Sequence, residues 1–145
     1  MNTPPATPQE SSAQEAWRRA RPGDRVIGWL VDERAREGLL ERFAPKYART
    51  VAHHVTLKPR VHERSALPGE VRARIVGRAD DGEGVEAMVV EIDGTLARPD
   101  GGTFHITWSL GESRKARESN DVIRTKGWSL FDTPVDVPLH PAVFR

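Results

Sequence analysis

The apolar residues of this chain come in short stretches that glycine, proline and charged residues interrupt, and this spacing limits the folds open to it. The main stretches lie at residues 26–31, 85–93 and 104–110, and no run approaches the 18 apolar residues of a membrane-spanning helix. The first residues hold neither a basic cluster nor an apolar segment, so they predict no secretion signal. We therefore expect a cytoplasmic protein without a membrane span.

Two periodicities alternate along the chain. Apolar residues on alternate positions, or in short unbroken runs, predict strands, and apolar residues three and four apart predict helices. Strands are predicted at residues 26–31, 50–57, 71–78, 85–93, 104–110 and 128–137, and helices at 10–20, 33–43 and, briefly, up to Arg124 from a cap at Ser119 or Asn120. Turn residues 80–84 predict a hairpin. Because both element types are interleaved and hairpins join the later strands, we expect the α+β class.

Length predicts one domain. A chain of 145 residues supports one compact domain. Residues 1–9, with three prolines among polar neighbours, predict a flexible tail. Residues 10–145 are therefore expected to form the single domain.

Composition excludes several kinds of chemistry. The 22 Lys and Arg against 21 Asp and Glu leave a net charge of +1, which argues against a protein that coats nucleic acid through its overall positive field. The absence of cysteine excludes disulfides, thiol nucleophiles and cysteine-ligated zinc. Chemistry must then come from His, Ser, Thr, Asp, Glu, Lys or Arg.

One four-residue pattern occurs twice. Residues 54–57 (His-Val-Thr-Leu) and 105–108 (His-Ile-Thr-Trp) share the form His, apolar, Thr, apolar, and each lies in a predicted strand. Residues i and i+2 of a strand point to the same face, so each copy presents an imidazole beside a hydroxyl. The composition predicts only about 0.04 such copies by chance. The alternative is a pair of strand polar residues that neighbours satisfy.

Paired imidazoles indicate acid–base chemistry near neutral pH. One of His54 and His105 can take a proton from water or a ribose hydroxyl while the other protonates the leaving oxygen. The hydroxyls of Thr56 and Thr107 can bind non-bridging phosphate oxygens. This set predicts phosphodiester chemistry at a nucleotide 2′/3′ position without a metal or another cofactor. Which histidine is acid and which is base stays open.

The two His-x-Thr-x motifs resemble those of the 2H phosphoesterase superfamily, which includes RNA 2′,3′-cyclic phosphodiesterases, 2′-5′ RNA ligase-like proteins and the cyclic phosphodiesterase domain of fungal tRNA ligases. Residues 28–33 (Gly-Trp-Leu-Val-Asp-Glu) and 119–123 (Ser-Asn-Asp-Val-Ile) look like the tRNA-ligase branch. The resemblance implies a bilobal, pseudo-twofold fold with antiparallel sheets around a central cleft, and His54, His105, Thr56 and Thr107 as catalytic residues. The chain is shorter than many members, which leaves its substrate open.

Strand parity extends the predicted site. Lys58 and Ser109 lie two residues beyond the threonines and are predicted to face substrate, and Arg114 and Lys115 lie in a basic loop that is predicted to line the cleft mouth. For each, a solvated surface position is the alternative. Trp29 and Trp108 are expected in the core.

The remaining histidines receive no catalytic role. His53 has the opposite strand parity to His54 and is expected to be structural, while His62 and His140 lie in predicted loops. A zinc site built from His53, His54, His62 and His105 is disfavoured, because adjacent strand histidines face opposite ways and no carboxylate or His-x-x-x-His partner is present.

The leading hypothesis is a monomeric, metal-independent phosphodiesterase that opens a 2′,3′-cyclic phosphate on an RNA end or a small nucleotide, as in RNA processing or repair. One alternative is hydrolysis of a cyclic or 2′-5′-linked signalling oligonucleotide. Another is a non-catalytic RNA- or nucleotide-binding module.

Overall fold

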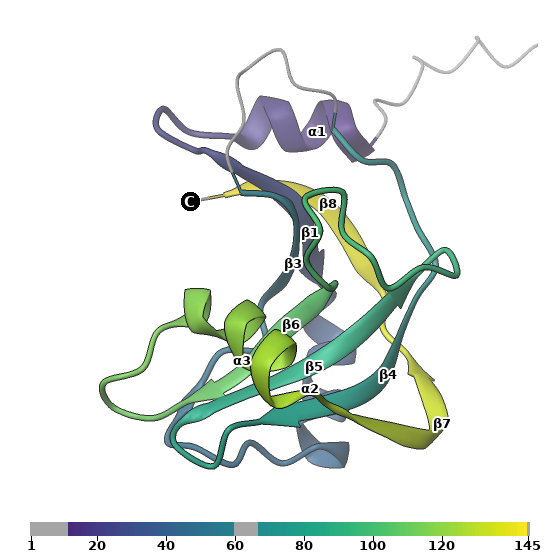
Figure 1. The fold of residues 1–145 in the computed structure, drawn as a ribbon. Helices are drawn as coiled ribbons and strands as arrows, with labels where there is room; N and C mark the ends of the chain where they lie inside the picture. Colours follow the sequence, from purple (N-terminus) through teal and green to yellow (C-terminus); the bar gives the residue numbers. More distant parts are fainter. Residues whose placement is uncertain (1–11, 60–66, 145) are drawn as a thin grey trace, which may run out of the picture.

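The structure, a computed structural model, describes residues 12–59 and 67–144 (Figure 1). The tail predicted for residues 1–9 lies outside these ranges, as does His62, which was assigned to a predicted loop. The helices are α1 (Ser12–Arg19), α2 (Glu33–Arg42) and α3 (Ser119–Lys126), with a 3₁₀ turn η1 (Ala116–Glu118) before α3. No helix in the described ranges is long and apolar enough to cross a membrane.

Within the described residues, eight strands form one sheet: β1 (Val26–Val31), β2 (Arg49–Thr50), β3 (His54–Lys58), β4 (Ala73–Asp80), β5 (Val85–Ile92), β6 (His105–Leu110), β7 (Ser129–Asp136) and β8 (Leu139–Phe144). Their order is β7-β4-β5-β6-β3-β1-β8, and the short β2 pairs with β6. Each strand pairing is antiparallel. The predicted α+β class is confirmed.

The two faces of the sheet have separate cores. On one face, Leu39 of α2 joins Val55, Ile106 and the indole of Trp108 in the larger core. On the other face, α3 packs on β4, β5 and β6, with Val122 among the buried residues. Helix α1 packs on β8, so α1 and α3 lie at different ends of the sheet and leave β3 between them (Figure 1). Trp29 and Trp108 are buried in the larger core, as predicted.

Helix α2 begins where a cap is provided. The Asp32 carboxylate accepts a hydrogen bond from the Ala35 amide at 3.0 Å, which satisfies an amide that the helix leaves unpaired. From α2, Arg36 reaches back and donates to the carbonyl oxygens of Val51 and Ala52 at 3.0 and 2.9 Å. The helix thereby fixes the segment that leads into the first His-x-Thr strand.

The strand predicted at residues 50–57 is interrupted. Residues 51–53 leave the strand conformation between β2 and β3, and Ala52 has a φ of 44°, in the left-handed region. The apolar and β-branched composition of the segment concealed this break. Strand β8 was not predicted, and His140, which was assigned to a loop, lies on it.

Gly28 provides a sharp test of the register between β1 and β3. It pairs with Thr56, and a Cβ atom there would overlap the carbonyl oxygen of Val55. We expect Gly28→Ala to lower the free energy of unfolding by about 3 kcal/mol or more. Gly38→Ala is the matched control, because Gly38 is an exposed position of α2 where a Cβ meets nothing within 4 Å.

We expect Gly38→Ala to raise the free energy of unfolding by about 1 kcal/mol, the helix propensity difference between the two residues. Urea denaturation of both variants gives the two values. Equal stabilities for the two variants would contradict the close β1–β3 approach at Gly28.

Candidate functional site

The two His-x-Thr motifs meet on one face of the sheet. Strands β3 and β6 are antiparallel neighbours with Val55 opposite Ile106, and this register places each histidine opposite the threonine of the other motif. Val55 and Ile106 are fully buried in the core beneath α2. Because successive side chains of a strand alternate, the imidazoles and hydroxyls of both motifs point to the opposite face. The structure thus brings His54, Thr56, His105 and Thr107 together.

His105 is held at one ring nitrogen. Its Nδ1 lies 2.8 Å from the carbonyl oxygen of Thr103. A carbonyl only accepts, so Nδ1 carries a proton and Nε2 is the nitrogen whose protonation can change. Burial lowers the pKa of His105; the Arg98 charge also lowers it, while the Thr103 carbonyl acts in the opposite direction.

His54 is held by aromatic neighbours. The rings of His54 and Phe144 have centroids 4.3 Å apart, and the Nδ1 atoms of His53 and His54 are 2.9 Å apart. Burial lowers the pKa of His54 to about 4, and the nearby imidazoles of His53 and His105 add to the shift. His54 is therefore uncharged in the free protein at neutral pH.

The two threonines differ in their surroundings. Thr56 is half-buried on β3, whereas Thr107 is buried and its Oγ1 lies 2.8 Å from Oγ of Ser119, at the start of α3. Thr107 Oγ1 also lies 3.4 Å from the carbonyl oxygen of Ala116. Ser119 thus fixes the hydroxyl of the second motif. Sequence analysis noted Ser119 as a helix cap and as part of the resemblance to tRNA ligases, but assigned it no contact with Thr107.

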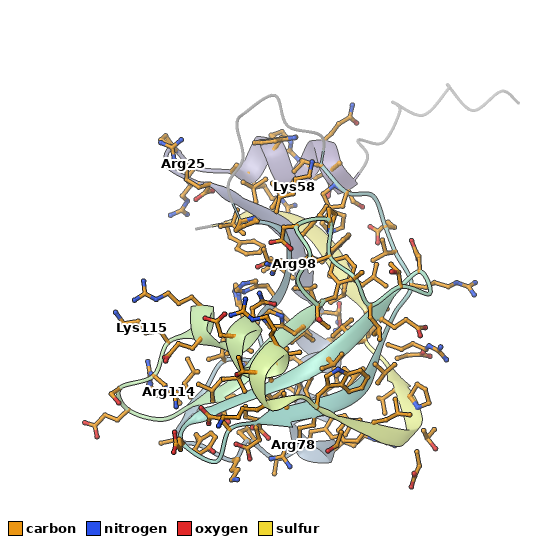
Figure 2. The ribbon with its side chains drawn as sticks, in the orientation of Figure 1. Arg25, Lys58, Arg78, Arg98, Arg114 and Lys115 are labelled. Atoms are coloured by element: carbon orange, nitrogen blue, oxygen red, sulfur yellow. The ribbon has the colours of Figure 1, made fainter. Side chains whose placement is uncertain are left out.

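Arg98 lies close enough to His105 for its charge to act on the imidazole, and the sequence did not predict this. Its side chain is only 9% exposed, and it forms a two-pronged ion pair with Asp100, with N–O distances of 2.9 and 2.6 Å. The Arg98 hydrogen bond holds the pKa of Asp100 down at about 2, so the pair stays ionised and close to neutral overall. Figure 2 shows Arg98 near the centre of the molecule. Arg98 and Asp100 lie in one turn, in which the Gly101 amide donates to the carbonyl oxygen of Arg98 at 3.0 Å.

Arg114 was predicted at the cleft mouth, and in the structure its charge is paired with acidic side chains. Its guanidinium forms ion pairs with Asp81 at 2.7 Å and Glu118 at 3.1 Å and donates to the carbonyl oxygen of Glu83 at 2.7 Å. These contacts tie the loop after β6 to the β4–β5 hairpin. The sequence did not predict these partners, because a basic loop does not show which acids will lie beside it. Lys115, next along the loop, is exposed (Figure 2).

The parity prediction for Ser109 was wrong. The register between β5 and β6 shifts after the Glu86–Ser109 pair, so the two-residue repeat that began at His105 breaks before Ser109. Ser109 is fully buried and donates to the Glu86 carboxylate at 2.6 Å. It therefore stabilises the buried Glu86 and does not extend the His-x-Thr face. Arg78 also forms an ion pair with Glu86.

Lys58 ends β3 and is exposed. The register of β1 with β3 shifts here too, because Ile27 pairs with Lys58 while the adjacent Gly28 pairs with Thr56. The parity that was to carry Lys58 to the same face as Thr56 is therefore interrupted at Leu57. The structure leaves Lys58 at the end of the strand (Figure 2).

No group of three or more His, Asp or Glu side chains within residues 12–59 and 67–144 is arranged to hold a metal ion. No family model, curated protein or solved structure matches the chain. The chemical argument for this site is therefore its geometry: two imidazoles and two hydroxyls on one face, each histidine held at Nδ1.

The lowered histidine pKa values predict how stability changes with pH. The pKa values of His53, His54 and His105 lie below 6.5 in the folded protein. The unfolded chain therefore binds more protons than the folded one below pH 6.5, and the free energy of unfolding falls as pH decreases toward 4. We expect the melting temperature to drop between about pH 7.5 and about pH 5, above the range in which carboxylates titrate.

His54→Asn removes one of these groups and should reduce the size of that drop. Thermal unfolding of both proteins at the two pH values measures the difference. An identical drop in the variant would show that His54 titrates normally in the folded state.

Proposed function

We propose that the protein is a metal-independent phosphodiesterase that hydrolyses a 2′,3′-cyclic phosphate at an RNA end or on a small nucleotide, with His54 and His105 as acid and base. The single observation that carries the proposal is the Val55–Ile106 pairing, which sets two imidazoles diagonally across two adjacent strands with a threonine beside each. A two-lobed 2H phosphoesterase-like fold is part of this proposal.

The sheet order supports the two-lobed fold. The two motif strands are neighbours near the middle of the sheet, with β7, β4 and β5 beyond β6 and with β1 and β8 beyond β3. Each half has its own helix, α3 on β4–β6 and α1 on β8 (Figure 1). Such halves would be related by a pseudo-twofold axis between β3 and β6.

The proposed reaction needs one proton taken and one given. One imidazole, neutral at its Nε2, removes a proton from water, and the water oxygen forms a bond to phosphorus. The bond from phosphorus to the 2′ or 3′ oxygen breaks, and the other imidazole, protonated, gives its Nε2 proton to that oxygen. The hydroxyls of Thr56 and Thr107 bind the non-bridging oxygens.

Substrate charge reconciles this cycle with the lowered pKa values. Both imidazoles have lowered pKa values in the free protein, mainly because burial disfavours their charged forms. A bound phosphodiester carries a negative charge, and an opposite charge within a few ångström favours protonation of an imidazole. Substrate binding would therefore supply the protonated member of the pair.

Removing either histidine should abolish most of the activity. In EDTA, we expect His54→Ala and His105→Ala each to lower kcat for adenosine 2′,3′-cyclic phosphate by about 10²–10⁴, the usual contribution of a general acid or base. His140→Ala is the control, because His140 lies on the edge strand β8 and pairs with Asp32, the residue that caps α2. Full activity in either site variant, with the fold intact, would refute the two-histidine mechanism, and loss of wild-type activity in EDTA would favour a metal.

The pairing of two arginines with acids favours a small or end-bound substrate. Arg98 is paired with Asp100, and Arg114 with Asp81 and Glu118, so neither is available to follow a long phosphate backbone. The ratio of kcat/KM for a cyclic-ended RNA oligonucleotide to that for the mononucleotide should change less than about tenfold between about 50 and about 200 mM salt. A steep loss would indicate many phosphate contacts and a long substrate.

The same assay separates the other hypotheses. A panel with 2′-5′ oligoadenylates and cyclic dinucleotides tests the signalling-oligonucleotide alternative directly. Tight binding of these ligands without turnover of any of them would favour a non-catalytic binding module.

A further inference from the structure

His53 precedes the first motif and lies against its histidine. The Nδ1 atoms of His53 and His54 are 2.9 Å apart, and the two rings are nearly perpendicular at 84°. The predicted strand parity would have put these rings on opposite faces. Instead β3 begins only at His54, directly after the left-handed Ala52, and this turn of the backbone brings the rings together.

The position of His53 is fixed from several sides. Its carbonyl oxygen accepts a hydrogen bond from the Val31 amide at 2.9 Å, which ties it to β1. Arg36 holds the two preceding carbonyl groups. Phe144 lies beside both imidazoles, edge-on to His53 with centroids 6.3 Å apart and tilted against His54 with centroids 4.3 Å apart. The contact therefore belongs to the packed structure at the start of β3.

Proton counting gives the contact a direction. A hydrogen bond between two Nδ1 atoms contains one proton, so one imidazole donates and the other accepts. If His53 donated, a neutral His54 would carry its own proton on Nε2 and would have no lone pair left to take a proton. If His54 donates from Nδ1, its Nε2 is free to accept one.

The acid role requires the same direction. A protonated His54 has N–H groups at both Nδ1 and Nε2, so its Nδ1–H must donate, and the acceptor must be the Nδ1 lone pair of His53. His105 shows the equivalent arrangement, since its Nδ1 donates to the carbonyl of Thr103. In each motif histidine, Nδ1–H would then donate to a fixed acceptor, and Nε2 would be free to exchange a proton with substrate.

We infer that His53 is a positioning residue that accepts the Nδ1 proton of His54 and so keeps Nε2 of His54 as the nitrogen that exchanges protons with substrate. The inference rests on the proposed function for the role of His54, but it does not depend on whether His54 is the acid or the base. It gives the exposed His53 a function that its position before the motif did not suggest.

The groups around the pair are consistent with an acceptor at His53. Burial and the Arg36 charge lower the pKa of His53, which keeps its Nδ1 lone pair available at neutral pH. The charged or titratable groups that act on His54 are His53 and His105. Protonation of His53 would place two N–H groups against each other, so the contact would be lost in acid.

Three variants distinguish the role of His53 as a hydrogen-bond acceptor from its packing beside Phe144. His53→Phe keeps an aromatic ring beside Phe144 but offers no acceptor, His53→Asn keeps a neutral acceptor near the Nδ1 position, and His53→Asp provides a charged one. We expect His53→Phe to lower kcat by about 10–100-fold with little change in KM, the usual effect of losing a partner that orients a histidine. His53→Asn should restore most of this loss.

The proton position can be read without substrate. Nitrogen-15 NMR of the imidazole rings should show the Nδ1–H form of neutral His54 in the wild type and in His53→Asn, and a loss of this preference in His53→Phe. In His53→Asp the nearby carboxylate should raise the pKa of His54, and the limb of the kcat/KM profile that His54 determines, the acid limb for a base or the alkaline limb for an acid, should move to higher pH with it.

A wild-type His54 that carries its proton on Nε2, or a His53→Phe variant with wild-type kcat, overturns the inference. Failure of the proposed function gives a different result, because a protein that hydrolyses none of the substrates still shows the tautomer of His54 by NMR. The tautomer then tests the contact, and the kcat of the variants tests its use.

Discussion

The Val55–Ile106 pair is the contact on which the site depends. It is the one register position that joins β3 to β6, and both side chains are fully buried beneath α2. A slip of one residue would turn every side chain of one strand to the other face. The buried apolar residue of that strand would then exchange faces with its histidine and threonine, at the cost of burying an imidazole and a hydroxyl group in an apolar core. The hydrophobic core therefore determines which face holds the candidate site.

Sequence periodicity predicted the site where the strands are regular and failed where they are not. The His-x-Thr motifs lie in unbroken stretches, so parity placed His54 with Thr56 and His105 with Thr107 on shared faces. Ser109 lies beyond a register shift, and the prediction failed there. His53 stands before the strand begins, after the left-handed Ala52. An extra residue or a positive φ follows from how neighbouring strands pair, and single-strand periodicity contains no information on it.

Proline explains why the last strand was missed. Proline cannot donate to a strand ladder, so a segment that contains Pro138 and Pro141 argues against a strand. Strand β8 lies at the edge of the sheet and pairs with β1 alone, where a missing amide can face outward. Pro134 in β7 has the same position at the opposite edge. The tolerance for proline thus depends on the place of a strand in the sheet, which the order along the chain did not reveal.

On the sheet face that carries the His-x-Thr side chains, polar residues occupy the region between the helices α1 and α3. Where α3 covers β5, the sheet presents Ala87 and Val89 to it, and these residues pair with Thr107 and His105 on β6. Further along the same face, β3 presents an imidazole and a hydroxyl. Helix α1 packs beyond them, on β8. Apolar residues at β3 would have exposed a patch to water, while covering the motif residues with a helix would have closed them to substrate. Between α1 and α3, His54 and His105 are therefore partly buried, and this burial lowers their pKa values.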